Sequence, residues 1–152
     1  MPMKRDGTYL FDNIHVTGFC DISHNKLASL VGCPKRIDSN FTCNINALTD
    51  LIGAPKWVGD IFSCSGNNLT SLNGCPEYVG GHFYCSWNEL TSLEGCPKII
   101  MGNMACRNNL IETLEGFPTE IRGNLDLRDT RGNKFSQSDI EAVCKVDGII
   151  YL

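Results

Sequence analysis

The sequence lacks any apolar run approaching the roughly 18 residues that a membrane-spanning helix needs. Its start, MPMKRDGTYLF, has two basic residues but no apolar core of signal-peptide length behind them. Basic residues are also in deficit, with 13 Lys and Arg against 17 Asp and Glu, so the net charge of −4 provides no general attraction to phosphate backbones. We therefore expect a soluble cytoplasmic protein without a nucleic-acid or membrane partner.

Catalytic and metal-binding motifs are absent as well. The histidines His15, His24 and His82 are scattered, and none lies in an H-E-x-x-H, G-x-S-x-G or phosphate-loop setting. The nine cysteines include no C-x-x-C, and an odd number cannot pair completely. The sequence predicts no enzymatic activity, no cofactor and no metal site.

The sequence does contain a repeat. Residues 85–97, CSWNELTSLEGCP, nearly copy residues 64–76, CSGNNLTSLNGCP, and the two segments start 21 residues apart. With 152 residues the chain has the length of about one domain, and most of it follows this period. Five columns recur at that offset: Gly32, Gly53, Gly74, Gly95 and Gly116; Pro34, Pro55, Pro76, Pro97 and Pro118; Leu30, Leu51, Leu72, Leu93 and Leu114; Asn25, Asn46, Asn67, Asn88 and Asn109; Leu27, Leu48, Leu69, Leu90 and Ile111.

Two further apolar columns, two residues apart, predict one short strand in each repeat. They are Cys20, Phe41, Phe62, Phe83, Met104, Leu125 and Ile22, Cys43, Cys64, Cys85, Cys106, Leu127. Alternate residues of a strand point to one face, so these side chains should form the buried face. A proline near the far side of each repeat leaves little room for a helix there. The sequence predicts a mainly β solenoid with a parallel sheet of about six strands.

The repeat reads approximately I-x-G-x-F-x-C-x-x-N-x-L-T-S-L-x-G-C-P and resembles the leucine-rich repeat, L-x-x-L-x-L-x-x-N-x-L. Phe83, Cys85, Asn88 and Leu90 occupy matching positions, and the resemblance covers residues 16–131. It implies a non-enzymatic module for protein–protein interaction. The Leu-then-Pro ending of each repeat is similar to the very short repeats of bacterial effectors and of uncharacterised bacteriophage repeat proteins, and its Gly-Cys-Pro variant looks most like the bacteriophage group. That likeness implies a phage accessory protein that binds and inhibits a host defence protein in the host cytoplasm.

The Asn and Cys columns have structural interpretations. The Asn column follows the strand, where an inward amide can bond the backbone groups of the turn, and we expect a ladder of such amides. Apolar residues replace cysteine within both Cys columns, at Ile22, Ala54, Phe117 and Leu127. Since a free Cys behaves as a small hydrophobe, we expect buried, reduced thiols and a reducing compartment.

Residues 1–15 and 132–152 depart from the repeat and should cap its two ends. In the second segment, Ser138 and Glu141 have the spacing of a capping box and predict one short helix. Its predicted buried face is Ile140, Val143 and Cys144. Cys144 is interpreted as a core residue rather than a nucleophile. The final IIYL predicts a strand covering the last repeat.

Outward-facing aromatic residues predict a binding surface. His82 and Tyr84 alternate with buried positions, and Trp87 follows at the end of the strand, above neighbouring Ser, Gly and Ala residues. Exposed Trp and Tyr in such a setting are typical of binding hot spots, although rings that merely pack across strands are the alternative. The candidate partner-binding residues, named the aromatic patch, are His82, Tyr84, Trp87, Arg107 and Ile61.

A second column forms the alternative candidate site. Trp57, Tyr78 and Ile99, named the Trp57 stripe, are predicted on the opposite, convex side, flanked by Arg36 and Glu120. They would either pack neighbouring turns together or bind a partner, and a homo-oligomer through this stripe remains open. The competing function is therefore a structural or assembly protein that acts through self-association.

Overall fold

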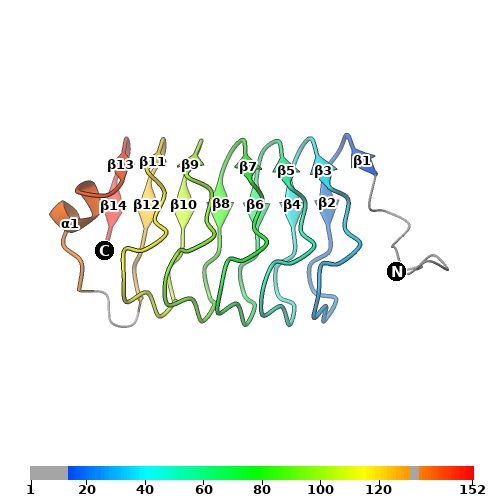
Figure 1. The fold of residues 1–152 in the computed structure, drawn as a ribbon, viewed down its shortest axis with the longest axis horizontal. Coiled ribbons are helices and arrows are strands. Elements are labelled where there is room, and N and C mark those ends of the chain that lie inside the picture. The colour runs from blue at the N-terminus through cyan, green and yellow to red at the C-terminus, as the bar shows by residue number, and fades with distance from the viewer. Residues whose placement is uncertain (1–13, 131–133) are drawn as a thin grey trace.

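The computed structural model describes residues 14–130 and 134–152, which form a β-solenoid (Figure 1). One turn of the solenoid, here called a coil, corresponds to one repeat, and the coils stack in sequence order along a single axis. Residues 1–13 of the first predicted cap lie outside the described residues, as do residues 131–133, where the predicted repeats meet the second cap. Within the described residues, no helix has the length and apolar character needed to cross a membrane.

The predicted parallel sheet is present and contains seven strands in the order β14-β12-β10-β8-β6-β4-β2. Equivalent residues of neighbouring repeats pair directly, as Phe62 does with Phe83. Six strands are the predicted ones, and the seventh confirms the predicted strand at the C-terminal end. The strands are β2 (Cys20–Asp21), β4 (Phe41–Thr42), β6 (Phe62–Ser63), β8 (Phe83–Tyr84), β10 (Met104–Ala105), β12 (Leu125–Asp126) and β14 (Ile150–Tyr151).

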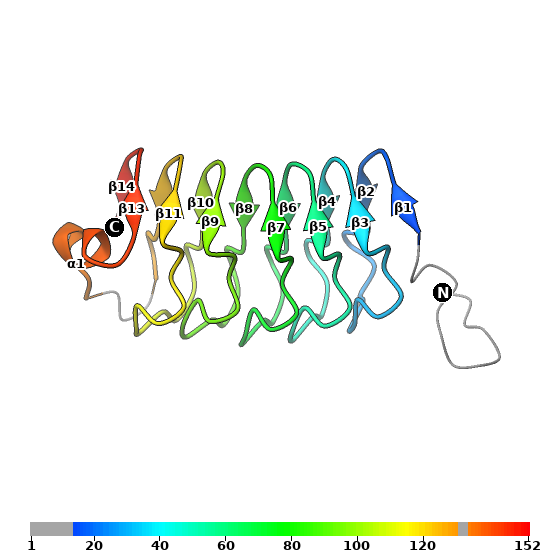
Figure 2. The ribbon, with the colours of Figure 1, turned by 45° about the horizontal axis from the view of Figure 1, so that its top comes forward.

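Each coil contains a second short strand, so the prediction of one strand per repeat is wrong. These strands form a four-stranded and a three-stranded parallel sheet. They are β1 (His15–Val16), β3 (Arg36–Ile37), β5 (Trp57–Val58), β7 (Tyr78–Val79), β9 (Ile99–Ile100), β11 (Glu120–Ile121) and β13 (Lys145–Val146). A short turn joins each one to the following strand of the seven-stranded sheet (Figure 2). The Trp57 stripe therefore lies on the strands that directly precede that sheet.

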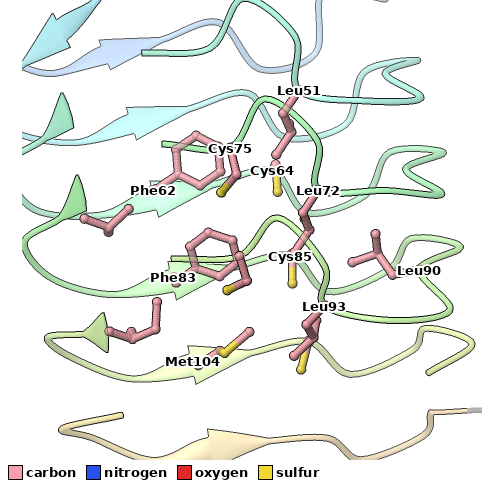
Figure 3. Close-up of a cluster of buried hydrophobic side chains, with 14 of the residues drawn as sticks. Leu51, Phe62, Cys64, Leu72, Cys75, Phe83, Cys85, Leu90, Leu93 and Met104 are labelled. Carbon is pink, nitrogen blue, oxygen red and sulfur yellow. The ribbon is translucent and has the colours of Figure 1, made fainter. Parts of the chain in front are cut away.

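The core consists of stacked columns of identical or similar side chains. Phe41, Phe62 and Phe83 are fully buried, and their rings stack with centroid distances of 5.9 and 5.5 Å. Cys64 and Cys85 lie beside them and are also fully buried, as predicted (Figure 3). Because each side chain packs mainly on its counterpart in the next coil, burial depends on the stack and not on any single coil.

The Gly column closes a tight turn in each coil. Its glycines have φ between 76° and 95°, a region that side chains with a Cβ rarely adopt. In the central coil, the Cys75 N–H donates to the Leu72 carbonyl at 2.9 Å, with Gly74 at the third position of the turn. A positive φ at that position is characteristic of a type II turn, which explains why glycine recurs there.

The C-terminal helix α1 spans Gln137–Glu141. Its capping box is formed by Ser136 and Asp139, so the predicted Ser138 and Glu141 box was displaced by two residues. Ile140 and Cys144 are buried as predicted, but Val143 is 46% exposed because it lies beyond the end of this short helix.

Candidate functional site

The Asn column forms the predicted ladder of buried amides. Oδ1 of Asn88 accepts from the Leu69 N–H at 3.0 Å in the preceding coil. Its Nδ2 donates to the Cys85 carbonyl at 3.0 Å and to the Cys64 carbonyl at 3.2 Å. Asn46, Asn67 and Asn109 repeat this arrangement. These side chains are fully used in holding the coils together and are not a binding site.

A second ladder, which the sequence analysis missed, runs through the column that contains His82. The Nδ1 atom of His82 accepts from the Asn103 N–H at 2.8 Å. In the same way, Oδ1 of Asn103 accepts from Asn124, and Oδ1 of Asn124 accepts from Ile149. His82 is half-buried and therefore has a structural role in addition to its place in the aromatic patch.

His82 and Tyr84 form the fixed part of the aromatic patch. Their rings stack at 5.7 Å with an interplanar angle of 8°, and both residues are half-buried. Partial burial, together with the nearby Asp60 carboxylate, raises the pKa of the Tyr84 hydroxyl. Ile61 lies in the His82 column one coil earlier and is also half-buried. The structure thus brings three of the five candidate residues onto one face in two neighbouring coils.

Trp87 lies past the end of β8 and is 59% exposed. Its backbone φ of 59° is left-handed, and the equivalent residue of every described repeat shares this conformation. The column is His24, Ile45, Gly66, Trp87, Asn108 and Asp129, with φ between 51° and 70°. Gly, Asn and Asp adopt this region readily, whereas Ile and Trp do so at a cost.

A hollow of about 340 Å³ lies between Trp87 and Ile45, above Gly66, with Asn44 and Ser65 also lining it. Ile45 is 55% exposed. The sequence analysis missed Ile45, although its position in the Trp87 column, two repeats earlier, was the signal that could have identified it. The hollow extends the candidate site toward the N-terminal coils.

Arg107 lies in the coil after Trp87, and its carbonyl accepts the Trp87 N–H at 3.0 Å. Among the described residues, the cations placed over rings are Arg36 on Trp57 and Arg128 on Tyr151, not Arg107 on the patch. The exposed Arg107 side chain acts through its charge on the Asp126 carboxyl in the next coil, whose pKa it helps to lower, while Arg128 forms the ion pair with that carboxylate. It is near Trp87 and available to a partner.

The residues of the Trp57 stripe pack partly on one another. The Trp57 and Tyr78 rings stack at 3.8 Å, and the Arg36 guanidinium lies 4.7 Å from the centre of the Trp57 ring. A hollow of about 320 Å³ adjoins them and is lined by Glu77, Tyr78, Lys98, Ile99, Met101 and Arg122. Both faces of the Trp57 ring are covered in this way, whereas Tyr78 and Ile99 are 36% and 44% exposed.

The cysteines are all free, and eight of the nine are buried. Burial raises the pKa of Cys33 and of Cys144 to about 11, which suppresses the reactive thiolate at neutral pH. No group of three or more His, Cys, Asp or Glu side chains in the described part of the chain could hold a metal ion.

Comparison with known proteins assigns no function to this arrangement. No protein-family model matches the chain, and no curated protein matches it either. The functional argument therefore rests on the surface formed by the aromatic patch and the adjoining hollow.

Proposed function

We propose that the protein is a non-enzymatic binding module, a short-repeat solenoid of the leucine-rich-repeat type, that holds a partner protein on the aromatic patch. The observation that carries this proposal is Trp87. Its large ring is 59% exposed and is held on a left-handed backbone. That conformation costs about 1–2 kcal/mol for a residue with a Cβ. Every described repeat has this backbone at the equivalent position, where Gly, Asn and Asp adopt it readily, so partner binding accounts for the large exposed ring and not for the conformation itself.

The surroundings of Trp87 support the proposal. Tyr84 is fixed by its stack on His82, and the neighbouring coils present Ser65, Gly66 and Ala105 instead of large side chains. Rigid aromatic side chains that project above small neighbouring residues bury much area on binding with little loss of conformational entropy. The two amide ladders stiffen the backbone beneath them, so the patch is preorganised.

The resemblance to bacteriophage repeat proteins supports a finer proposal. The chain acts as an accessory protein in the host cytoplasm, where it binds and inhibits a host defence protein. A reducing cytoplasm suits nine unpaired thiols. The proposal includes no catalytic activity and no cofactor.

Affinity capture from a bacterial host lysate, quantified by mass spectrometry, tests the proposal. Three baits are compared: the parent, a Tyr84→Ala/Trp87→Ala double variant, and Tyr78→Ala from the Trp57 stripe as the matched control. We expect a protein that the parent and the control both capture and the double variant loses. Capture of the same proteins by all three baits would contradict the proposal.

Self-association is the second candidate function, and the end of the seven-stranded sheet favours it. β14 is the last strand of the sheet, and Ile149 and Leu152 beside it are 58% and 45% exposed. An open edge strand with exposed apolar residues invites pairing with another chain. Sedimentation equilibrium distinguishes the two: a concentration-dependent dimer that Ile149→Lys abolishes would support assembly, whereas a monomer at all concentrations would reject it.

A further inference from the structure

The hollow beside Trp87 is a slot with two walls and a floor. Ile45, Gly66 and Trp87 are equivalent residues of three consecutive coils, and Gly66 lies between the other two. The coils are kept in register by hydrogen bonds from the Ile45 N–H to the Ser65 carbonyl and from the Gly66 N–H to the Ser86 carbonyl, both 2.9 Å. Neighbouring strands lie about 4.8 Å apart, so the backbones that carry the two walls are separated by roughly 9.6 Å.

The hollow has one aliphatic and one aromatic wall. The Ile45 side chain leans over the floor, since its Cγ1 lies 3.1 Å from the position of a Cβ at Gly66, and Trp87 lines the opposite side. A planar ring that enters here can stack on the Trp87 ring, and such a pair is more stable than its buried area alone would give. The slot therefore favours an aromatic side chain over a branched aliphatic one.

The protein does not fill the slot itself because the floor residue is glycine. A Cβ at Gly66 would lie 3.1 Å from Cγ1 of Ile45, and φ at Gly66 is 70°. Asn108, in the same column, shows that Asn adopts this backbone conformation in the same fold. The rim is also rigid, since Oδ1 of Asn44 accepts from the Ser63 hydroxyl at 2.7 Å and from the Ser65 N–H at 2.8 Å.

The charge beside the slot indicates what should flank the ring. Arg107 lies in the coil beyond Trp87, about two coils or roughly 9.6 Å from the floor of the slot. One coil further on, Arg128 is already paired with Asp126 at 2.8 Å and lies over the Tyr151 ring. The charge of Arg107 also helps to lower the pKa of the Asp126 carboxyl, but Asp126 is bound through its oxygens to Arg128, so the guanidinium of Arg107 can still donate to an incoming carboxylate.

We infer that the partner presents an extended segment whose aromatic side chain enters the slot between Ile45 and Trp87 and whose acidic side chain, two residues along, pairs with Arg107. Residues two apart in an extended chain lie on one face about 6.7 Å apart, and the side chains cover the remaining distance. This inference rests on the proposed function, because it specifies the chemistry of the partner at the same site.

Titration of ¹⁵N-labelled protein with blocked tripeptides tests the inference. The probes are acetyl-Phe-Ser-Asp-amide, acetyl-Phe-Ser-Lys-amide and acetyl-Ala-Ser-Asp-amide, with uridine monophosphate as a planar ligand of another class. We expect the first to shift the amide resonances of Ile45, Gly66 and Trp87 with a Kd of about 1 mM. The Lys probe should bind about threefold more weakly, as expected for an exposed ion pair, and the Ala probe should cause no localised shift.

Two matched variants separate filling of the slot from damage to the fold. Gly66→Asn places a side chain in the slot on a backbone conformation that Asn adopts readily. It should weaken the binding of the Phe-Ser-Asp probe by about tenfold or more. Asn108→Gly, in the same column outside the slot, should bind like the parent. Parent-like binding by Gly66→Asn, shifts confined to other coils, or tighter binding of uridine monophosphate would overturn the inference.

The captured partner distinguishes this inference from the proposed function. If Trp87→Ala loses the partner while Gly66→Asn retains it, the patch binds but the slot stays empty, and only the inference fails. If both variants retain it, both claims fail. Loss of the partner in both variants, with Asn108→Gly unaffected, supports both.

Discussion

Oδ1 of Asn88 accepts the backbone N–H of Leu69 at 3.0 Å, so a side chain of one coil satisfies the turn of the coil before it. Through Nδ2, Asn88 also bonds one carbonyl of its own coil and one of the preceding coil. A single buried side chain thus joins two coils, and its repetition gives the solenoid a rigid frame on which the aromatic patch is carried.

Replacing a member of this ladder should destabilise the whole chain. Asn67→Ala leaves the Leu48 N–H without its acceptor and removes one of the two amide donors from each of the Cys43 and Cys64 carbonyls, which keep Asn46 and Asn88. The free energy of unfolding should fall by about 1–3 kcal/mol. Asn25→Ala, at an exposed position of the same column, is the control and should cost less. Urea unfolding measures both, and an unchanged midpoint for Asn67→Ala would show that the turn is satisfied in another way.

The sequence predicted the Asn ladder and the thiol columns because each repeats the same residue with the same partners. Asn88 and Cys85 recur at a fixed offset, and stacked coils give equivalent residues equivalent surroundings. The second strand was missed because it has one buried column, from Ile37 to Ile121, without the second apolar column two residues away that identified the other strand. Its outward residue also varies between coils, from Arg36 to Ile99.

Three features depended on geometry that the sequence pattern does not display. His82 and Asn103 share a ladder role because imidazole Nδ1 and amide Oδ1 accept at similar positions, which residue names alone do not reveal. The cap position was mispredicted because Ser136 and Ser138 each have a carboxylate three residues later, and this spacing alone does not show which serine begins the helix. Ile45 was missed because a β-branched residue is not expected on a left-handed backbone.

The second ladder, which runs through the His82 column, can be tested at His82. Asn occupies the equivalent position in other coils, so His82→Asn should keep the bond to the Asn103 N–H and unfold near the parent temperature. His82→Ala leaves that N–H unpaired and should lose about 1–3 kcal/mol. Thermal unfolding followed by circular dichroism compares the two. Equal melting temperatures for both variants would mean that the ladder contributes no stability.

Close backbone approach between coils can be tested at Gly59. A Cβ added there would overlap the Asp38 carbonyl of the preceding coil, and the atoms in its way belong to the backbone and cannot rotate aside. Gly59→Ala should therefore lower stability by more than about 1 kcal/mol. Gly18→Ala, whose Cβ meets no atom within 4 Å, is the control. Matching urea midpoints for the two variants would contradict the observed spacing of the coils.

Because the thiols are buried, the protein should lose stability as the pH becomes alkaline. Burial raises the pKa of Cys33 and of Cys144 to about 11, above the value of about 8.5 for a thiol in the unfolded chain. The unfolded state therefore loses protons first, so the contribution to stability is complete below about pH 8.5 and is lost as pH rises through 11. Urea unfolding at a series of pH values should show a decline beginning near pH 8.5.

The rate of thiol labelling at neutral pH tests the burial of the same cysteines. The half-buried Cys20 should react first, and the buried cysteines should react at the rate of unfolding. Fast labelling of all nine thiols, or a flat pH profile, would contradict the buried-thiol assignment.

The most direct test of the account is the affinity of the captured partner for single patch variants, measured by isothermal titration calorimetry. Trp87→Ala and Tyr84→Ala should each weaken binding by about 2 kcal/mol or more, as hot-spot residues do, with unfolding midpoints close to that of the parent. Tyr78→Ala should leave the affinity unchanged. Parent-like affinity for the Trp87 and Tyr84 variants, with binding lost in Tyr78→Ala, would contradict the account and assign the partner to the Trp57 stripe.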